Sequence, residues 1–264
     1  MTIRQKIWSG LVAIFLILFA TASGVFWARQ NFRAPVITPS TTTSPAATSL
    51  TPTPASASPR LSSSPPPTVA LLPTTALIKN VPFIEQAPHK NWDATHEETC
   101  EEAAVLTVVH YLEGERQPTA DEIETELQNL IVWEERVLGR YEDTTAAETS
   151  RILSEYFSYG NRVHLLQLTN LDTIKTEIAA GRPVIVPAAG RLLGNRYFKS
   201  PGPVYHMVVV TGYDEDEIIT NDPGTQHGAG YRYPADQFWN AIHDFVDRTD
   251  EGMATGAKVA LVVD

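Results

Sequence analysis

The feature that most constrains this chain is a segment, residues 34–75, that carries almost no charge and is rich in proline, threonine and serine. Of its 42 residues, 10 are Pro, 10 are Thr and 8 are Ser, and Arg60 is the only charged one. This composition offers too little apolar surface to offset the entropy lost on folding, and the prolines favour extended, polyproline-like backbone. We therefore expect a disordered linker here, which divides the chain into three parts.

The first part, residues 1–33, contains an uncharged and mostly apolar run from Ile7 to Ala28. The 22 residues of this run would span about 30 Å of hydrocarbon as one helix, and Trp8 and Trp27 lie near its ends, where indole rings favour the membrane interface. The Ala-Thr-Ala sequence at residues 20–22 is typical of a signal-peptidase site, so a cleaved signal peptide is the alternative. We expect a single-pass helix that anchors the remainder outside the cytoplasm at the cell membrane; cleavage would instead give a secreted protein.

The third part, residues 76–264, has the composition of an acidic folded domain. All 31 Asp and Glu residues lie at or after Glu85, against 15 Lys and Arg residues, which gives this part a net charge of −16. A sequence-independent nucleic-acid binder needs a basic face for the phosphates, so we expect no nucleic-acid partner. The single cysteine, Cys100, excludes an intramolecular disulfide and an all-cysteine zinc site.

Hydrophobic periodicity and turn residues predict helices early in this domain and strands late in it. A Thr followed three residues later by Glu, a capping pattern, begins the predicted helices at Thr99, Thr119 and Thr145. The predicted helices cover residues 99–112, 145–160, 171–180 and 234–242, with another starting at 119. An extended segment is expected over 76–86, and strands over 163–168, 183–186, 206–213, 217–221, 231–233 and 258–263. This order is typical of an α+β domain with an antiparallel sheet.

Cys100 is a candidate nucleophile because it takes the first position of a predicted helix. There the unpaired main-chain N–H groups and the helix dipole stabilise a thiolate and lower the pKa of the thiol. Glu101 and Glu102 oppose this effect, but we expect Glu102 to turn back toward Thr99 as part of the cap, so that the dipole prevails. A single cysteine is more often a small buried apolar residue. Cys100 alone is therefore weak evidence for catalysis.

His206 is a candidate partner for the thiol, since a thiolate nucleophile needs a base that later protonates the leaving group. His206 begins a predicted strand, and Asn221 and Asp222 end the next one. One hairpin can thus place the imidazole beside a side chain that holds it in the useful tautomer. We expect Asp222 to be that side chain, with Asn221 as the alternative.

At this point the sequence resembles the C39-like cysteine peptidase domain, over residues 77–264. The stretches that carry the resemblance are Val81–Gln86, Glu98–Ala104, Gly181–Val186, His206–Asp214 and Asn221–Gly224. The resemblance implies a papain-like fold in which Cys100 is the nucleophile, His206 the general base and acid, and Asp222 the orienting carboxylate. It also places the oxyanion-hole glutamine at Gln86. Many relatives have Gly-Pro after the cysteine, where this chain has Glu101-Glu102, and the double-glycine specificity of transporter-fused members is not implied.

We therefore expect a membrane-anchored, extracytoplasmic thiol hydrolase that cleaves peptide or other amide bonds, acts as a monomer on a peptide or protein substrate, and uses no cofactor or metal. Two alternatives share the fold: a non-catalytic peptide-binding module, and a thiol acyltransferase such as a transglutaminase-like enzyme. A further alternative is a metal site built from His89, His96, Glu97 and Cys100, or one that includes His227. Its spacings match no common zinc pattern.

Overall fold

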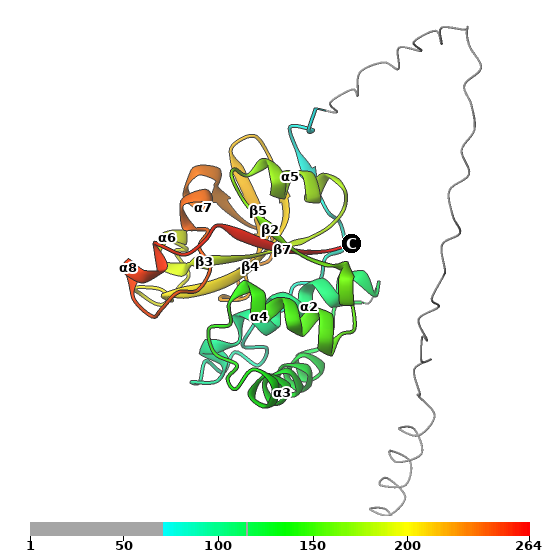
Figure 1. Ribbon diagram of the computed structural model, residues 1–264, viewed down its shortest axis with the longest axis vertical. Coiled ribbons are helices and arrows are strands. Elements are labelled where there is room, and N and C mark those ends of the chain that lie inside the picture. The colour runs from blue at the N-terminus through cyan, green and yellow to red at the C-terminus, as the bar shows by residue number, and fades with distance from the viewer. Residues whose placement is uncertain (1–70, 115) are drawn as a thin grey trace, which may run out of the picture. The chain divides into compact units, whose positions relative to one another are not determined.

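The computed structural model describes residues 71–114 and 116–264, so the predicted anchor and most of the predicted linker lie outside the described residues. Within the described ranges, no helix combines the length and the apolar character needed to cross a bilayer. Helices lie on both faces of one antiparallel sheet, and the prediction of an α+β fold is confirmed (Figure 1).

The sheet of the described residues has seven strands, and neighbouring strands pair antiparallel. Six strands follow the order β2-β7-β3-β4-β5-β6, and β1 pairs with β4 off this path. Val209 of β4 pairs with Asn221, so the residue that follows β5 lies beside the first half of β4. The strands are β1 (Ala76–Leu77), β2 (Val163–Gln167), β3 (Val184–Ala189), β4 (Tyr205–Tyr213), β5 (Glu217–Asn221), β6 (Tyr231–Pro234) and β7 (Val259–Val263).

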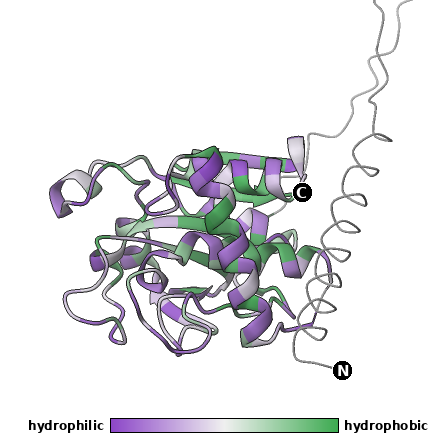
Figure 2. Ribbon diagram, turned by 90° about the horizontal axis from the view of Figure 1, so that it is seen from below, coloured by the Kyte–Doolittle hydropathy of each residue, from purple (hydrophilic) through white to green (hydrophobic). Residues whose placement is uncertain are grey.

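Two helical layers cover the two faces of the sheet. In Figure 1, α2 (Cys100–Leu112), α3 (Ala120–Val137) and α4 (Ala146–Arg151) lie on one side, and α5 (Asp172–Ala179) and α7 (Ala235–Ala241) on the other. Each layer encloses its own cluster of buried apolar residues against the sheet. Figure 2 shows the hydrophobic colour concentrated in the interior elements and the hydrophilic colour in the peripheral loops. The shorter elements are η1 (His96–Glu98), η2 (Ile152–Tyr156), η3 (Gly160–Arg162), α6 (Gly190–Leu193) and α8 (Asp250–Met253).

Helix α2 is the central element of the first layer, because all of its residues from Cys100 to His110 are buried. A helix that is buried on every side must pack against neighbours all round. It packs on β3 and β4 of the sheet and is covered by α3 and α4. This packing brings the first residue of α2 against the start of β4, where His206 lies.

The helix starts divide into two kinds. At Thr119 and Thr145 the Thr side chain and the Glu three residues later form complete capping boxes, which confirms those two predictions. At Thr99 the same pattern forms no cap, so that prediction is wrong. The buried Thr99 hydroxyl instead donates to the main-chain oxygen of Gln86, at 3.0 Å. A hydrogen bond to a distant main-chain oxygen thus replaces the local cap of the helix.

Smaller differences from prediction occur at element ends. The helix expected over residues 145–160 is α4, which continues into the wider turn η2 and ends at Tyr156. Strand β3 continues to Ala189, three residues beyond its predicted end. The four-residue helices α6 and α8 were not predicted, because one helical turn is too short to show a periodicity.

Candidate active site

A cavity of about 970 Å³ opens between the start of α2 and the start of β4. Three of the predicted site residues, Cys100, His206 and Gln86, line it. We call the part formed by Cys100 and its neighbours Glu101 and Glu102 the helix side. The part formed by His206 and the residues after β5 is called the sheet side.

On the sheet side, His206 and Asp222 are in direct contact. His206 Nε2 lies 2.7 Å from Asp222 Oδ1, and both side chains are buried. The antiparallel register of β4 and β5 produces this contact, since the residue after β5 returns beside the start of β4. Asn221 is occupied elsewhere: its Nδ2 donates to the main-chain oxygen of Pro82 at 2.8 Å. The imidazole therefore contacts Asp222, as expected, rather than Asn221.

Asp222 accepts three further hydrogen bonds. The main-chain N–H of Gly224 donates to Oδ1 at 2.9 Å, Asn195 Nδ2 donates to Oδ2 at 2.9 Å, and the Tyr233 hydroxyl also donates to Oδ2. Burial by itself raises the pKa of Asp222, but the charge of His206 and the donated hydrogen bonds outweigh it, and the pKa lies below its ordinary value. The carboxylate thus stays ionised in a fully buried position. Sequence reasoning missed Asn195 and Tyr233, which lie far from Asp222 along the chain.

Two close neighbours hold the His206 ring in place. A Cβ atom at Gly224 would lie 2.8 Å from His206 Cε1, so any side chain there would press against the ring. The Phe198 ring meets the imidazole edge-on, with ring centroids 5.2 Å apart and an interplanar angle of 80°. Such T-shaped contacts are favourable for aromatic pairs. Contact from two sides, together with the bond to Asp222, fixes the ring orientation.

On the helix side, Cys100 begins α2 as predicted, but its thiol donates to Glu101 Oε2 at 3.0 Å. Within the described residues, no hydrogen bond joins the thiol to His206. Burial raises the pKa of the Cys100 thiol well above its ordinary value, and the charge and hydrogen bond of Glu101 raise it further. The expectation of a lowered pKa is therefore wrong for this arrangement. Burial is the largest cause of the shift, and the adjacent Glu101 carboxylate is the next.

Glu101 is held in place by a second contact. Its Oε1 accepts the main-chain N–H of Thr144 at 2.8 Å, while Oε2 faces the thiol. Burial raises the pKa of Glu101 well above its ordinary value, with a smaller contribution from the charge of Glu102. The side chain is thus anchored on one oxygen and bonded to the candidate nucleophile through the other.

Glu102 does not turn back toward Thr99 as expected but lies in the interior beside Glu134 of α3. Both side chains are fully buried, and among the described residues no N–H or hydroxyl group donates to their carboxyl oxygens, so the two carboxyls hydrogen-bond only with each other. Burial and then the neighbouring charge of Glu134 raise the pKa of Glu102 well above its ordinary value. Burial likewise raises the pKa of Glu134, to about 8. Two buried carboxyls in contact are stable only when they share a proton.

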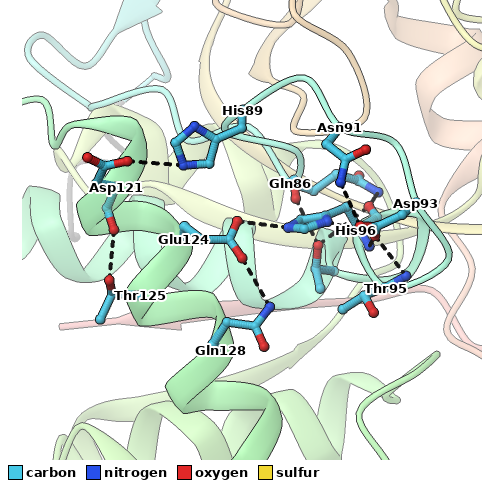
Figure 3. A network of polar contacts seen from close by, with 11 residues as sticks. Gln86, His89, Asn91, Asp93, Thr95, His96, Asp121, Glu124, Thr125 and Gln128 are labelled. Atoms are coloured by element: carbon cyan, nitrogen blue, oxygen red, sulfur yellow. Dashed lines mark hydrogen bonds and ion pairs between the residues drawn. The ribbon is translucent and has the colours of Figure 1, made fainter.

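Gln86 lies at the edge of the cavity and is bonded to both sides of it. Its main-chain N–H donates to the oxygen of Pro223 at 3.2 Å, beside Asp222 on the sheet side. Its side-chain Nε2 donates to the main-chain oxygen of His96 at 2.8 Å, on the segment that leads into α2 (Figure 3). The structure therefore brings all four predicted site residues to one cavity or into contact with a residue that lines it.

The metal alternative finds no support in the arrangement of the histidines. His89 pairs with Asp121 at 3.2 Å, and the two ring nitrogens of His96 face Asp93 and Glu124. In residues 71–114 and 116–264, no group of three or more His, Cys, Asp and Glu side chains is placed to hold a metal ion.

Two solved structures are similar to this chain at low sequence identity. Among solved structures, the chain is similar to one assigned to a C39-like peptidase from Bacillus anthracis, with 15% identity, coverage of 72% of this chain and 97% of that chain, and a TM-score of 0.47. It is also similar to xylellain, a cysteine protease from Xylella fastidiosa, with 10% identity, coverage of 74% and 87%, and a TM-score of 0.43. No curated protein matches the chain significantly.

The assignment rests on the family match rather than on these distant structures. The sequence matches the Peptidase_C39 like family over residues 78–246, a region that contains Gln86, Cys100, His206 and Asp222. The matched region spans well over half of the sequence. The chain therefore belongs to the Peptidase_C39 like family and is, by family, a cysteine peptidase.

Proposed function

We propose that residues 76–264 form a papain-like thiol hydrolase that cleaves peptide or other amide bonds, with Cys100 as nucleophile and His206 as general base and acid. Asp222 orients the imidazole, and Gln86 helps to bind the oxyanion. The observation that carries this proposal is the buried 2.7 Å contact of His206 Nε2 with Asp222 Oδ1, beside the cavity that contains Cys100.

The Asp222 contact determines which nitrogen of His206 is the base. Because an ionised carboxylate only accepts hydrogen bonds, the neutral ring carries its proton on Nε2. The lone pair is then on Nδ1, and no hydrogen bond within the described part of the chain uses that atom. Nδ1 is therefore the nitrogen available to take a proton from the thiol.

The reaction then follows from these positions. The Cys100 thiol rotates from Glu101 toward His206, Nδ1 takes its proton, and Sγ attacks the carbonyl carbon of the scissile bond. The oxyanion accepts hydrogen bonds from the Cys100 main-chain N–H and the second Nε2 hydrogen of Gln86. His206 returns the proton to the leaving amine, which leaves a thioester on Sγ. A water molecule deprotonated at Nδ1 attacks the thioester, and the released thiol recovers the proton.

The walls of the cavity suit a peptide substrate. Trp92 and Tyr197 line it and are each about 40% exposed, at 41% and 40%, and Lys90 also lines it. Aromatic faces and a cation can contact apolar and carboxyl groups of a peptide, respectively. We propose a peptide or protein substrate, and a protein that acts as a monomer.

The test compares thiol reactivity with turnover in the full chain. Cys100→Ser should fold but lose nearly all hydrolysis of a peptide panel, because a serine hydroxyl is not activated as a thiol is. Mass spectrometry of the wild type during turnover should detect an acyl-thioester on Cys100. His227→Ala is the matched control, since His227 lines the same cavity without contact to Asp222.

Two other outcomes would redirect the proposal. If wild type and Cys100→Ser bind the panel equally and neither turns it over, the domain is a peptide-binding module. If the acyl group passes to an added amine in preference to water, the chain is a thiol acyltransferase. Only hydrolysis that depends on Cys100 supports the proposal as stated.

We also propose that the domain is held outside the cytoplasm by the apolar run at residues 7–28, through the linker at residues 34–75. Protease added to intact cells should then release a soluble fragment that begins within the linker. A protected linker, or a domain recovered from the cytoplasm, would contradict this arrangement. N-terminal sequencing of the untreated protein distinguishes an anchor from a cleaved signal peptide.

A further inference from the structure

The buried His96 ring lies between two carboxylates, one at each ring nitrogen. Nδ1 is 2.8 Å from Asp93 Oδ1, in the same loop, and Nε2 is 2.9 Å from Glu124 Oε2, on α3 (Figure 3). His96 is 7% exposed, so water does not compete freely for either nitrogen. This contact joins the loop before α2 to a helix that begins more than twenty residues later in the chain.

A carboxylate at each nitrogen is satisfied only by a doubly protonated ring. A neutral imidazole carries one N–H group, so its second nitrogen would face a carboxylate with a lone pair. Burial lowers the pKa of His96, but the hydrogen bonds and charges of Glu124 and Asp93 outweigh it, and the pKa lies above its ordinary value. Those two carboxylates are the charged groups that face the ring, one from its own loop and one from α3.

The main chain of His96 continues this contact to Gln86. The His96 carbonyl oxygen accepts the Gln86 Nε2 hydrogen bond at 2.8 Å, and the same oxygen lies 3.5 Å from the Thr99 hydroxyl. Gln86 and the start of α2 are thus both oriented by the position of one carbonyl group. The ring of that residue is fixed by α3.

We propose that His96 is a positioning residue for Gln86, and that its imidazolium, bonded to Asp93 and Glu124, keeps the Gln86 amide directed at the oxyanion. Loss of the ring proton breaks one of the two carboxylate contacts, releases the loop from α3 and misaligns the amide. The inference rests on the proposed role of Gln86. It adds a pH dependence to the acyl-transfer step that does not involve the thiol or His206.

The neighbouring pair formed by His89 and Asp121 provides a matched control. Asp121 lies on the same helix as Glu124 and contacts a histidine at 3.2 Å, but its side chain is 92% exposed (Figure 3). Within the described residues, the His89 ring makes no hydrogen bond or ion pair with Gln86 or His96. Asp121→Ala therefore removes a histidine–carboxylate pair from α3 without touching the proposed path.

The first experiment measures the His96 pKa directly, by NMR titration of histidine-labelled full chain. In the wild type the His96 signal should titrate above the ordinary value for histidine. In Glu124→Ala it should titrate lower, because one carboxylate is gone and burial remains, and in Asp121→Ala it should not move. The Gln86 side-chain amide signals, assigned by their loss in Gln86→Ala, should shift with the His96 titration in the wild type.

The second experiment separates acyl transfer from thiol reactivity. Glu124→Ala should lower kcat about tenfold, which is less than the ~10²-fold loss expected when an oxyanion donor is removed. Alkylation of Cys100 by iodoacetamide should keep the wild-type rate. Asp121→Ala should match the wild type in both. Glu124→Gln is the conservative rescue: its amide can donate to the neutral ring, so kcat should persist at alkaline pH where the wild type has lost it.

The outcomes distinguish this inference from the proposed function. If no variant or wild type hydrolyses a substrate but His96 and Gln86 titrate together, the proposed hydrolysis fails and the structural link stands. If the enzyme is active and Glu124→Ala matches Asp121→Ala in kcat and in the His96 titration, the inference is wrong. Equal loss of kcat and of alkylation in Glu124→Ala would also overturn it, since that pattern indicates general unfolding of the site.

Discussion

The carboxylate of Asp222 on the sheet side receives hydrogen bonds from four groups, whereas the carboxyls of Glu102 and Glu134 behind the helix side have, among the described residues, only each other as hydrogen-bond partners. Both regions are buried to the same degree. The pKa of Asp222 is lowered by its donors, and the pKa values of Glu102 and Glu134 are raised by burial without them. Burial therefore does not determine ionisation by itself; the donors do.

The difference has a consequence for catalysis. On the sheet side, His206 already contacts the ionised Asp222, so the proposed base and its orienting group are in place before any substrate binds. The helix side holds a thiol with a raised pKa, bonded to Glu101. We therefore propose that the imidazole is preorganised and that the carboxyls around Cys100 control the reactivity of its thiol.

The largest effect should come from removing His206, the proposed base. His206→Ala should lower kcat/KM by about 10³-fold or more, because proton transfer to and from the reacting groups is lost. Alkylation of Cys100 by iodoacetamide should slow as well, since the proton acceptor for the thiol is gone. A steady-state hydrolysis assay and alkylation rates measure both. If His206→Ala is as active as His227→Ala, the imidazole has no part in the mechanism.

Removal of the orienting group should have a smaller effect. Asp222→Ala should lower kcat about 10²-fold with little change in KM, because the ring is still present but no longer held in one tautomer. Asn221→Ala is the control: its side chain bonds Pro82 and Gly230, so it should affect thermal stability more than kcat. The reverse ranking in kinetic and melting measurements would make Asn221 the orienting residue.

On the helix side, Glu134→Gln should stabilise the protein in an alkaline window. The pKa values of Glu102 and Glu134 are raised in the folded protein. Above pH 4.5, the ordinary carboxyl pKa, the unfolded chain therefore releases protons that the folded protein keeps. The stability due to these protons is complete below that pH and is lost as the pH rises through about 8, the value for Glu134.

A glutamine amide donates to Glu102 without titrating, so the gain should be about 1–3 kcal/mol near pH 9 and small at pH 4. Chemical denaturation at the two pH values measures it. An equal gain at both would mean that the two carboxyls do not share a proton.

The smallest effect should come from Glu101→Gln. The amide oxygen can still accept from the Thr144 N–H, and the amide nitrogen then donates to the sulfur, where Glu101 Oε2 accepts from the thiol in the wild type. We expect alkylation of Cys100 at neutral pH to become about tenfold faster, equivalent to about one pKa unit of the thiol. Slower alkylation would instead identify Glu101 as the base that takes the thiol proton.

The features predicted well from the sequence are those with local causes. The capping boxes at Thr119 and Thr145 need only residues within one helical turn, and both form. The contact of His206 with Asp222 was also predictable, because a two-strand hairpin fixes which residues meet across it.

The features predicted wrongly depend on how the folded chain packs around each residue. Thr99 has the same local pattern as Thr119, yet its hydroxyl bonds to Gln86. The pKa of Cys100 follows burial and Glu101 rather than the helix start. The sequence suggests only a metal-ligand role for His96, because nothing in the sequence links His96 to Glu124. Such outcomes depend on which side chains pack together in the folded protein, and the hydrophobic periodicity of the sequence does not indicate that.

The main chain of Gln86 is hydrogen-bonded to both walls of the cavity. Its N–H is bonded to Pro223 on one wall, and its C=O to Thr99 on the other. If the cavity widens on the side of Pro223, the bond from the Gln86 N–H to Pro223 breaks. The exchange of the Gln86 amide hydrogen with solvent deuterium therefore reports how often the bond to Pro223 opens, and we expect that frequency to limit how fast the proposed polypeptide substrate enters or leaves.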